Sequence, residues 1–295
     1  MSKIGVVLSS GGGRGVFAHT GFMSALEKLE IQIVASAGCS AGAIVGGVLA
    51  SGSTIDVWTN TLRKVRIEQF WTPRPLWQLL YIFGFRKGQG IAGFSDTSAA
   101  VRFLAENLHV ETFEECIYPF AAIALNIGTG KSAIFRKGPL ALGIMASAAV
   151  PGFYEPVQIG DQYYTDGAII DLAPANAICC QYELDVLLVH HTAQVNYLNE
   201  ELGRAYHLPW TMAKIMQRAI FRRRPWYTTG QPISIHACPC GCKAIIVVIE
   251  PKLPELSWPI TSDAAHIIDL ARSHALSQLE PIVESLNLNP HSLLA

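Results

Sequence analysis

Residues 31–50 read Ile-Gln-Ile-Val-Ala-Ser-Ala-Gly-Cys-Ser-Ala-Gly-Ala-Ile-Val-Gly-Gly-Val-Leu-Ala, and this stretch decides the fold. Its first part, residues 31–37, is a short apolar run that predicts a buried strand. Its last part, residues 41–50, is apolar and rich in small residues, which predicts a helix lying close against a sheet. A strand, a tight turn and a helix in succession are typical of an α/β protein.

The same region carries no charged residue from position 31 to position 55, so its length would allow a membrane-spanning helix. Five glycines and several serines interrupt the segment, however. We therefore interpret it as a buried strand, a turn and a buried helix rather than as a span.

Strand and helix patterns alternate outward from this stretch. Residues 4–8 predict a second buried strand, a helical pattern begins at Arg14, and residues 173–182 predict a helix before a strand at residues 185–190. The alternation predicts an α/β three-layer sandwich with a mostly parallel central sheet and helices on both faces. We expect one domain, 1–295, with a catalytic core at about 4–190 and the segment 191–295, containing helices and a strand, packed on it.

The composition limits the classes of protein to which this chain can belong. The chain has 295 residues, 50% of them hydrophobic and 15% charged, with 22 basic against 23 acidic residues. This excludes a disordered chain and gives no sign of a general nucleic-acid binder. The seven cysteines are odd in number and irregularly spaced, and the first residues do not form a signal peptide, so we expect a reduced, cytoplasmic compartment.

The turn between the strand and the helix contains Gly38-Cys39-Ser40-Ala41-Gly42, which fits Gly-x-Ser-x-Gly. A serine at such a turn is strained, and its neighbours need almost no side chain so that a substrate carbonyl can approach Oγ. The helix that follows directs its positive end at the same place. A glycine- and serine-rich loop without catalytic function is the alternative, but the flanking strand and helix favour a nucleophile.

A second glycine-rich turn, Ser10-Gly11-Gly12-Gly13-Arg14-Gly15, follows the strand at residues 4–8. Its bare amides suit either a phosphate-binding loop or an oxyanion hole. The dinucleotide and Walker patterns are not met, because Val16 stands at the last glycine position of the first and the Gly-Lys-Ser/Thr of the second is missing. Next to a serine turn, the oxyanion hole is the simpler interpretation.

A serine nucleophile needs a base. Asp166-Gly167-Ala168 follows an apolar hairpin, and His190 and His191 end a buried strand. Two mechanisms remain open from the residues alone. Either Asp166 activates Ser40 directly, or the serine, an aspartate and a histidine form a triad.

Four ordered stretches make the sequence resemble the patatin-like phospholipase family over about residues 4–190. They are Leu-Ser-Ser-Gly-Gly-Gly-Arg-Gly (8–15), Ala-Gly-Cys-Ser-Ala-Gly-Ala (37–43), Ala-Ser-Ala-Ala-Val-Pro-Gly-Phe-Tyr-Glu-Pro-Val (146–157) and Tyr-Thr-Asp-Gly-Ala (164–168). The resemblance implies a patatin-like fold and a catalytic dyad without histidine, with Ser40 as nucleophile and Asp166 as base. Its substrate would be an acyl ester of a lipid or lysophospholipid.

The resemblance also assigns supporting roles. The amides of Gly11, Gly12 and Gly13 would form the oxyanion hole, with Arg14 holding the loop. Other residues of the matched motifs would support the three turns: Gly15, Gly38, Gly42, Gly167 and Ala168. The sequence departs from the family at Ser10, which stands at the first glycine position and puts that amide donor in doubt, and at Ala168, where many members have glycine.

The dyad chemistry requires no cofactor and no metal. His236, Cys238, Cys240 and Cys242 raise the question of zinc, but alternate cysteines lack the usual C-x₂₋₄-C spacing. A fortuitous metal site or a redox-sensitive loop is the alternative there. For the whole chain, the alternatives to a dyad hydrolase are a triad esterase and a non-catalytic nucleotide- or lipid-binding module.

Aromatic and apolar side chains crowd residues 70–85, with Arg74, Arg86 and Lys87 around them. This pattern predicts either a lid that contacts a membrane surface or a helix facing the core or a second copy of the chain. A second cluster suits either a membrane contact or a solvated helix end: Arg218, Arg222, Arg223, Arg224, Trp226 and Tyr227. The sequence leaves the oligomeric state open.

Overall fold

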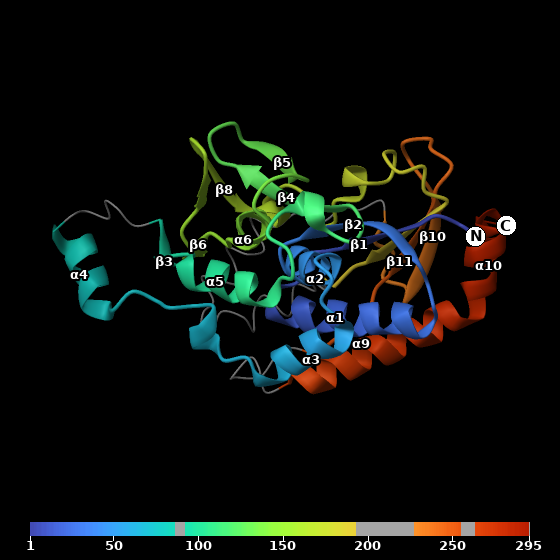
Figure 1. The fold of residues 1–295 in the computed structure, drawn as a ribbon, viewed down its shortest axis with the longest axis horizontal. Helices are drawn as coiled ribbons and strands as arrows, with labels where there is room; N and C mark the ends of the chain where they lie inside the picture. Colours follow the sequence, from blue (N-terminus) through green and yellow to red (C-terminus); the bar gives the residue numbers. More distant parts are fainter. Residues whose placement is uncertain (86–91, 193–226, 255–262, 295) are drawn as a thin grey trace.

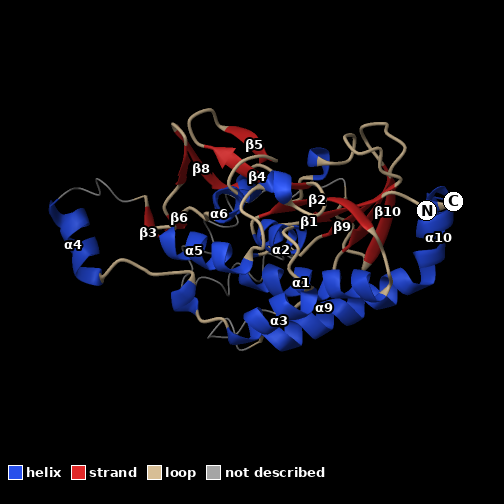
Figure 2. Cartoon of the chain, viewed as in Figure 1, coloured by secondary structure: helices blue, strands red, loops and turns tan. Residues whose placement is uncertain are grey.

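The computed structural model describes residues 1–85, 92–192, 227–254 and 263–294. A nine-stranded sheet runs through the protein in the order β10-β11-β9-β1-β2-β4-β8-β7, with β5 also paired to β4 (Figures 1 and 2). Its strands are β1 (Ile4–Leu8), β2 (Ile33–Cys39), β4 (Phe120–Asn126), β5 (Lys131–Phe135), β7 (Val157–Ile159), β8 (Gln162–Asp166), β9 (Val186–His190), β10 (Ile233–Ala237) and β11 (Ile245–Ile249). A separate pair joins β3 (Gly93–Ser95) to β6 (Gly152–Tyr154).

The five central strands, β11, β9, β1, β2 and β4, are parallel, and the antiparallel strands lie at the two borders. Every residue of β1, β9 and β11 is buried, and all except His190 are apolar or glycine, as is typical of parallel strands covered on both faces. The prediction of an α/β fold with a mostly parallel central sheet is confirmed. Because the strands are parallel, β1, β2 and β9 end at the same edge of the sheet.

Helices cover one face of the sheet (Figure 2). They are α1 (Gly12–Lys28), α2 (Ala41–Ala50), α3 (Ile55–Lys64), α5 (Ser98–Asn107), α6 (Leu140–Ala148) and α9 (Ala264–Leu279). Helix α9 packs tightly on α1, because a Cβ at Gly21 would lie only 2.2 Å from the Ile268 carbonyl oxygen. The C-terminal α9 and the strands β10 and β11 thus share one core with the N-terminal elements.

The opposite face is covered by the segment between β8 and β9, with its 3₁₀ turns η3 (Gly167–Ile169) and η4 (Ala175–Ala177). The helix expected at 173–182 is wrong. The chain leaves helical geometry at Ile178, whose φ is −131°. The Ala177 carbonyl, which a continuing helix would use for Gln181, accepts a 2.7 Å hydrogen bond from Arg136, and the Gln181 amide donates to Ile178 instead.

The remaining elements complete the described chain. Helix α4 (Leu76–Phe85) lies apart from the body in Figure 1, and α10 (Val283–Leu288) follows α9. Three further 3₁₀ turns connect elements and one ends the chain: η1 (Ile67–Gln69), η2 (Phe113–Glu115), η5 (Glu280–Ile282) and η6 (Pro290–Leu294). None of the helices in the described ranges has the length and apolar character needed to cross a bilayer. The uncharged stretch 31–55 forms β2, the turn at Ser40, α2 and the start of α3, as expected.

Candidate active site

Ser40 lies at the carboxyl end of β2, directly before α2. The neighbouring strand β1 ends at the same level, because Leu8 pairs with Gly38. The glycine loop that follows β1 therefore emerges beside Ser40. Two helices, α1 and α2, begin at this edge, and their first turns touch: a Cβ at Gly15 would lie 2.9 Å from the Ala41 Cβ.

The backbone at Ser40 is strained, with φ 52° and ψ −115°, in the left-handed range that L-residues rarely adopt. The turn requires glycine on both sides. A Cβ at Gly38 would lie 2.3 Å from the Gly42 carbonyl oxygen, and a Cβ at Gly42 would lie 2.1 Å from the Leu8 carbonyl oxygen. Ser40 is 5% exposed, and its amide donates a 3.0 Å hydrogen bond to the hydroxyl of Ser147 on α6.

Asp166 ends β8 and is fully buried. It pairs with Ala124 in β4, one residue beyond Ile123, which pairs with Cys39. This register places Asp166 level with Ser40 across one intervening strand. The carboxylate is oriented locally, because its Oδ1 accepts a 2.8 Å hydrogen bond from the Ala168 amide. Gly167 is required by space, since a Cβ there would lie 2.2 Å from the Ile123 carbonyl oxygen.

The strand register places Ser40 and Asp166 level, and the Ser40 hydroxyl acts on the pKa of the Asp166 carboxyl. Burial raises the pKa of the Asp166 carboxyl from 3.8 to about 7, while the Ala168 amide and the Ser40 hydroxyl act in the opposite direction. The second carboxylate oxygen, Oδ2, is buried and forms no hydrogen bond with the described residues. A buried carboxyl that titrates near neutrality beside a strained serine is able to exchange a proton with it.

The glycine loop forms the first turn of α1. Gly12 and Gly13 are exposed, and no acceptor within the described ranges takes the amides of Gly11, Gly12 or Gly13. Such amides, at a helix N-terminus, favour negative charge. The Ser10 amide is not available, because it donates a 2.8 Å hydrogen bond to the Leu172 carbonyl, and the Arg14 guanidinium contacts the Pro254 carbonyl at 3.4 Å.

Thr192, which follows β9, also holds the glycine loop in place. Thr192 donates its amide to the Ser9 hydroxyl at 2.9 Å and its own hydroxyl to the Ser10 carbonyl at 3.2 Å. A Cβ at Gly11 would lie 2.3 Å from the Thr192 Oγ1, so this position accepts only glycine. Thr192 and Ser147 are contacts that sequence reasoning did not single out, although Ser147 lies within one of the four matched stretches.

His190 lies on the far side of β1 from Ser40, because Leu8 pairs with both His190 and Gly38. Its ring stacks on Phe22 at 4.3 Å, and its Nδ1 contacts the Nδ1 of His19 at 2.8 Å. Since the Nε2 of His19 faces the Ser9 carbonyl at 2.7 Å, it carries the proton, and His190 is the donor to His19. Burial lowers the pKa of His190 well below 6.5, and His191 packs edge-on against Tyr227.

Comparisons with known proteins agree with this architecture. A sequence model of the family described as Patatin-like phospholipase matches residues 6–178. An uncharacterised NTE family protein of Mycobacterium tuberculosis is 32% identical over 174 residues, which cover 58% of this chain and 44% of that protein. Lysophospholipase NTE1 of Cryptococcus neoformans is 27% identical over 190 residues, covering 63% of this chain and 11% of that protein.

Among solved structures, human GIVD cytosolic phospholipase A2 superposes with a TM-score of 0.54 at 10% identity, covering 97% of this chain and 62% of that one. This likeness concerns the fold. The chain spans less than half the length of these two curated relatives. Because the family match extends over more than half of the sequence and includes both Ser40 and Asp166, the chain belongs to the patatin-like phospholipase family.

Proposed function

We propose that this protein is a serine acyl hydrolase that cleaves fatty acyl esters of lysophospholipids or phospholipids. Ser40 is the nucleophile and Asp166 is its base. The observation that carries the proposal is the pairing of a strained serine with a fully buried carboxyl whose pKa is raised to about 7. A base of that pKa accepts a proton at neutral pH and releases it again within the same cycle.

The reaction follows from this pair. The Asp166 carboxylate takes the proton of the Ser40 hydroxyl as Oγ bonds to the ester carbonyl carbon. The carbonyl electrons move to the oxygen, then return and expel the alcohol, which takes the proton from Asp166. Water then repeats the sequence on the acyl-serine: it gives a proton to Asp166 as its oxygen bonds to the acyl carbon, the bond from Oγ to that carbon breaks, and Asp166 returns the proton to Oγ, which releases the fatty acid and restores Ser40.

The oxyanion formed in both steps needs donors. The exposed amides of Gly12 and Gly13, together with that of Gly11, supply them at the positive end of α1. Ser10 is not part of this set, since its amide is used by Leu172. Three donors therefore remain despite the departure at the first loop position. Arg14 is proposed to hold the loop from outside through its contact with Pro254.

A triad with His190 or His191 is the alternative mechanism. In such a triad the histidine would bond an aspartate through one nitrogen and the serine through the other. The Nδ1 of His190 is instead used by His19, and its ring is stacked on Phe22. These contacts favour the dyad and give His190 a structural role.

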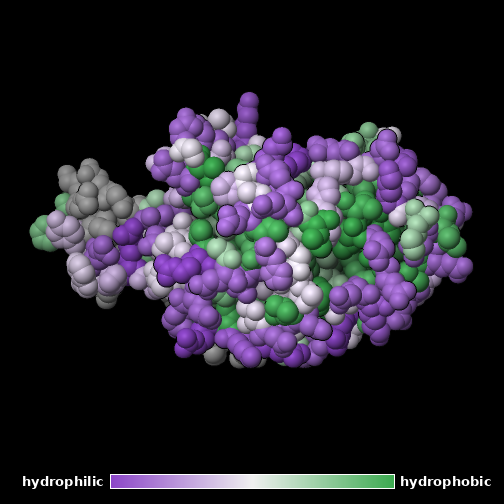
Figure 3. All heavy atoms as spheres, in the orientation of Figure 1, coloured by the Kyte–Doolittle hydropathy of each residue, from purple (hydrophilic) through white to green (hydrophobic). Residues whose placement is uncertain are grey.

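We propose a lipid substrate because of what the matched proteins are named. The matched Cryptococcus protein is named a lysophospholipase, and family membership adds phospholipids. The apolar helix α4 supports the same class of substrate. Among the side chains of this helix that the structure describes, four are largely exposed, at 70% for Trp77, 66% for Leu80, 52% for Tyr81 and 82% for Phe85. Figure 3 shows apolar surface at the outer end of this helix.

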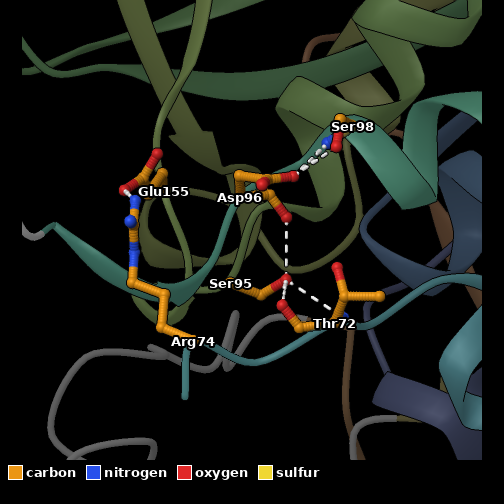
Figure 4. Close-up of polar contacts among 6 residues, drawn as sticks. All are labelled: Thr72, Arg74, Ser95, Asp96, Ser98 and Glu155. Carbon is orange, nitrogen blue, oxygen red and sulfur yellow. Dashed lines mark hydrogen bonds and ion pairs between the residues drawn. The ribbon is translucent and has the colours of Figure 1, made fainter. Parts of the chain in front are cut away.

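The exposure of α4 argues against a helix that faces the core of its own chain. Helix α4 lies within an arm, residues 72–95, whose two ends are held together by polar contacts (Figure 4). Thr72 and Ser95, at the two ends of the arm, bond each other at 3.0 and 3.2 Å, and Arg74 pairs with Glu155 next to β6. We propose that α4 contacts the lipid surface. Arg86, Lys87 and the basic cluster at 218–226 lie outside the described residues, and Tyr227, the last residue of that cluster, is buried.

The test of the hydrolase uses the full chain with a short-chain nitrophenyl ester and with lysophosphatidylcholine micelles. Ser40→Ala and Asp166→Asn should each reduce kcat/KM by at least about 10³-fold, since both remove a group that acts in the transition state. Asp161→Asn, in the exposed turn of the same β7–β8 hairpin, is the matched control and should leave the rate unchanged. Full activity of either site variant contradicts the dyad.

Two further variants separate the remaining alternatives. His190→Gln should retain activity within about tenfold under the dyad, whereas a triad predicts a loss comparable to that of Ser40→Ala. Trp77→Ser with Phe85→Ser should weaken hydrolysis of vesicle lipids several-fold and leave the short ester unaffected. If the double variant instead changes the oligomeric state in solution and not the use of vesicles, α4 is a contact between copies.

A further inference from the structure

Five of the seven cysteines meet at one place. Cys179 and Cys180 follow η4, whereas Cys238, Cys240 and Cys242 form the turn between β10 and β11. The Sγ atom of Cys240 lies 2.8 Å from that of Cys180, 2.9 Å from that of Cys238 and 3.8 Å from that of Cys179. Two overlapping triplets, 179–180–240 and 238–240–242, each have all their sulfurs within 4.8 Å.

These separations do not describe ordinary packing of thiols or a formed disulfide. A disulfide joins sulfurs at about 2.05 Å, and all seven cysteines are unbridged here. Four thiolates around one tetrahedral zinc at about 2.3 Å stand roughly 3.8 Å from each other. Each of the two triplets thus has its three sulfurs gathered about as closely as one metal ion requires, and Cys240 belongs to both.

The turn that supplies three of the sulfurs has the geometry to present them to an ion. Gly241 adopts a φ of 74°, and its amide donates a 3.0 Å hydrogen bond to the Cys238 carbonyl, which closes the turn. Metal binds the thiolate form of cysteine, and this turn places three such sulfurs within 4.8 Å of one another.

The cluster lies far from the proposed catalytic pair. Strand β11 begins at Ile245, which pairs with Val186, the first residue of the parallel strand β9. The cysteines precede these residues on each segment, so they lie at the starting edge of the parallel strands. Ser40 lies at the opposite edge, where the strands end. A ligand at the cysteines would therefore have a structural function and not a catalytic one.

We propose that this cluster binds one thiophilic d¹⁰ metal ion of the zinc class, with Cys180, Cys238, Cys240 and Cys242 as ligands and Cys179 beside them. Binding replaces four thiol protons, which are released to solvent, and forms four metal–sulfur bonds without any change of oxidation state. The ion joins the β10–β11 turn to the segment that covers the second face of the sheet. That segment contains no α-helix in its described residues, so a metal joint would fix it in place.

The sequence pattern alone argued against zinc, because Cys-x-Cys-x-Cys lacks the usual spacing of a zinc turn. The fold changes this, since the fourth ligand comes from a distant stretch. Cys180 is 58 positions before Cys238 in the chain, and only the pairing of β9 with β11 brings the two together.

The test measures metal content of the full chain, purified from zinc-supplemented medium under reducing conditions and dialysed free of loose metal. We expect about one zinc per chain in the wild type and loss of that zinc in Cys240→Ser. The matched control is Cys116→Ser, a half-buried cysteine outside the cluster, which should keep the metal. Cys180→Ser removes an exposed ligand and should also lose it, which keeps the test decisive if Cys240→Ser fails to fold.

A second readout is cobalt substitution. Co(II) titrated into metal-free protein should give a sulfur-to-metal charge-transfer absorption in the wild type and in Cys116→Ser, but not in Cys240→Ser. Three results would overturn the proposal: a wild type without stoichiometric metal or cobalt absorption, a Cys240→Ser variant that keeps the ion, or a disulfide-linked peptide between the two segments in freshly reduced protein.

Discussion

The hydroxyl of Ser147 accepts a 3.0 Å hydrogen bond from the backbone amide of Ser40. Both residues are buried, so this amide has no access to water as an alternative acceptor. Helix α6 thereby holds the strained turn in the conformation that exposes the Ser40 Oγ to the Asp166 carboxyl. Ser147 lies within residues 146–157, one of the four stretches that carry the family resemblance.

Ser147→Ala should lower both stability and activity. It leaves a buried amide without a partner, which costs about 1–3 kcal/mol of unfolding free energy, and it loosens the turn at Ser40. Ser51→Ala is the matched control, because the Ser51 hydroxyl also makes buried hydrogen bonds, to Val48 and from His109, at the other end of α2. Denaturant unfolding should show a loss in both variants, and kcat should fall only in Ser147→Ala. Equal kcat values for the two variants would remove Ser147 from the positioning of Ser40.

The rate of ester hydrolysis should depend on the ionisation of Asp166. Burial raises the pKa of this carboxyl to about 7, and only its ionised form accepts the serine proton. We expect kcat/KM to decrease about tenfold for each pH unit below this pKa. A stopped-flow or plate assay with a neutral nitrophenyl ester from pH 5 to pH 9 measures the profile. A rate that stays constant down to pH 5 would contradict the assignment of Asp166 as base.

Asp166→Asn should stabilise the fold at alkaline pH. The folded-state pKa of about 7 exceeds the ordinary 3.8, so between these two values the folded protein keeps a proton that the unfolded chain has released. The unfolding free energy of the wild type therefore decreases as pH rises through this window, by up to about 4 kcal/mol. The asparagine variant lacks this titration. We measure the unfolding free energy of both proteins by chemical denaturation at pH 4.5 and at pH 8. The variant should gain stability relative to the wild type at the higher pH. An equal difference at the two pH values would mean that folding does not raise the pKa of Asp166.

The strain at Ser40 makes a prediction about glycine. At a φ of 52°, glycine has no Cβ to clash, and the Ser40 side chain makes no capping hydrogen bond that would be lost. Relief of strain of about 1–3 kcal/mol exceeds the entropic cost of glycine, about 0.5–1 kcal/mol, so Ser40→Gly should be more stable than Ser40→Ala by about 1 kcal/mol. At Ala43, inside α2, the same change to glycine should instead destabilise the protein. A Ser40→Gly variant less stable than Ser40→Ala would show that the turn is unstrained.

Much of the fold was predictable because local pattern and tertiary structure agree there. The strand at residues 4–8 and the helix at residues 41–50 are each an apolar run next to a glycine-rich turn. The Ser40 turn was predictable for a steric reason, since glycines at 38 and 42 are the residues that its close approaches demand.

Other features depend on contacts between distant residues and were missed. The segment 173–182 is apolar enough for a helix. However, Arg136, which is distant in sequence, donates a hydrogen bond to the Ala177 carbonyl that a helix would use internally. Strand β10 is a half-buried edge strand whose side chains carry no strong alternation. The meeting of Cys180 with Cys240 and the hydrogen bond from Ser40 to Ser147 have no signature in local sequence, because both arise only when the sheet has formed.

The most direct test of the central claim is labelling of the full chain by an alkyl fluorophosphonate, with the modified residue located by peptide mass spectrometry. The fluorophosphonate reacts only with a hydroxyl made nucleophilic by a neighbouring base and bound near oxyanion donors. The dyad predicts one adduct, on Ser40, that forms rapidly in the wild type and at a rate lower by at least about 10²-fold in Asp166→Asn. Labelling at another residue, or equal rates of labelling at Ser40 in the two proteins, would contradict it.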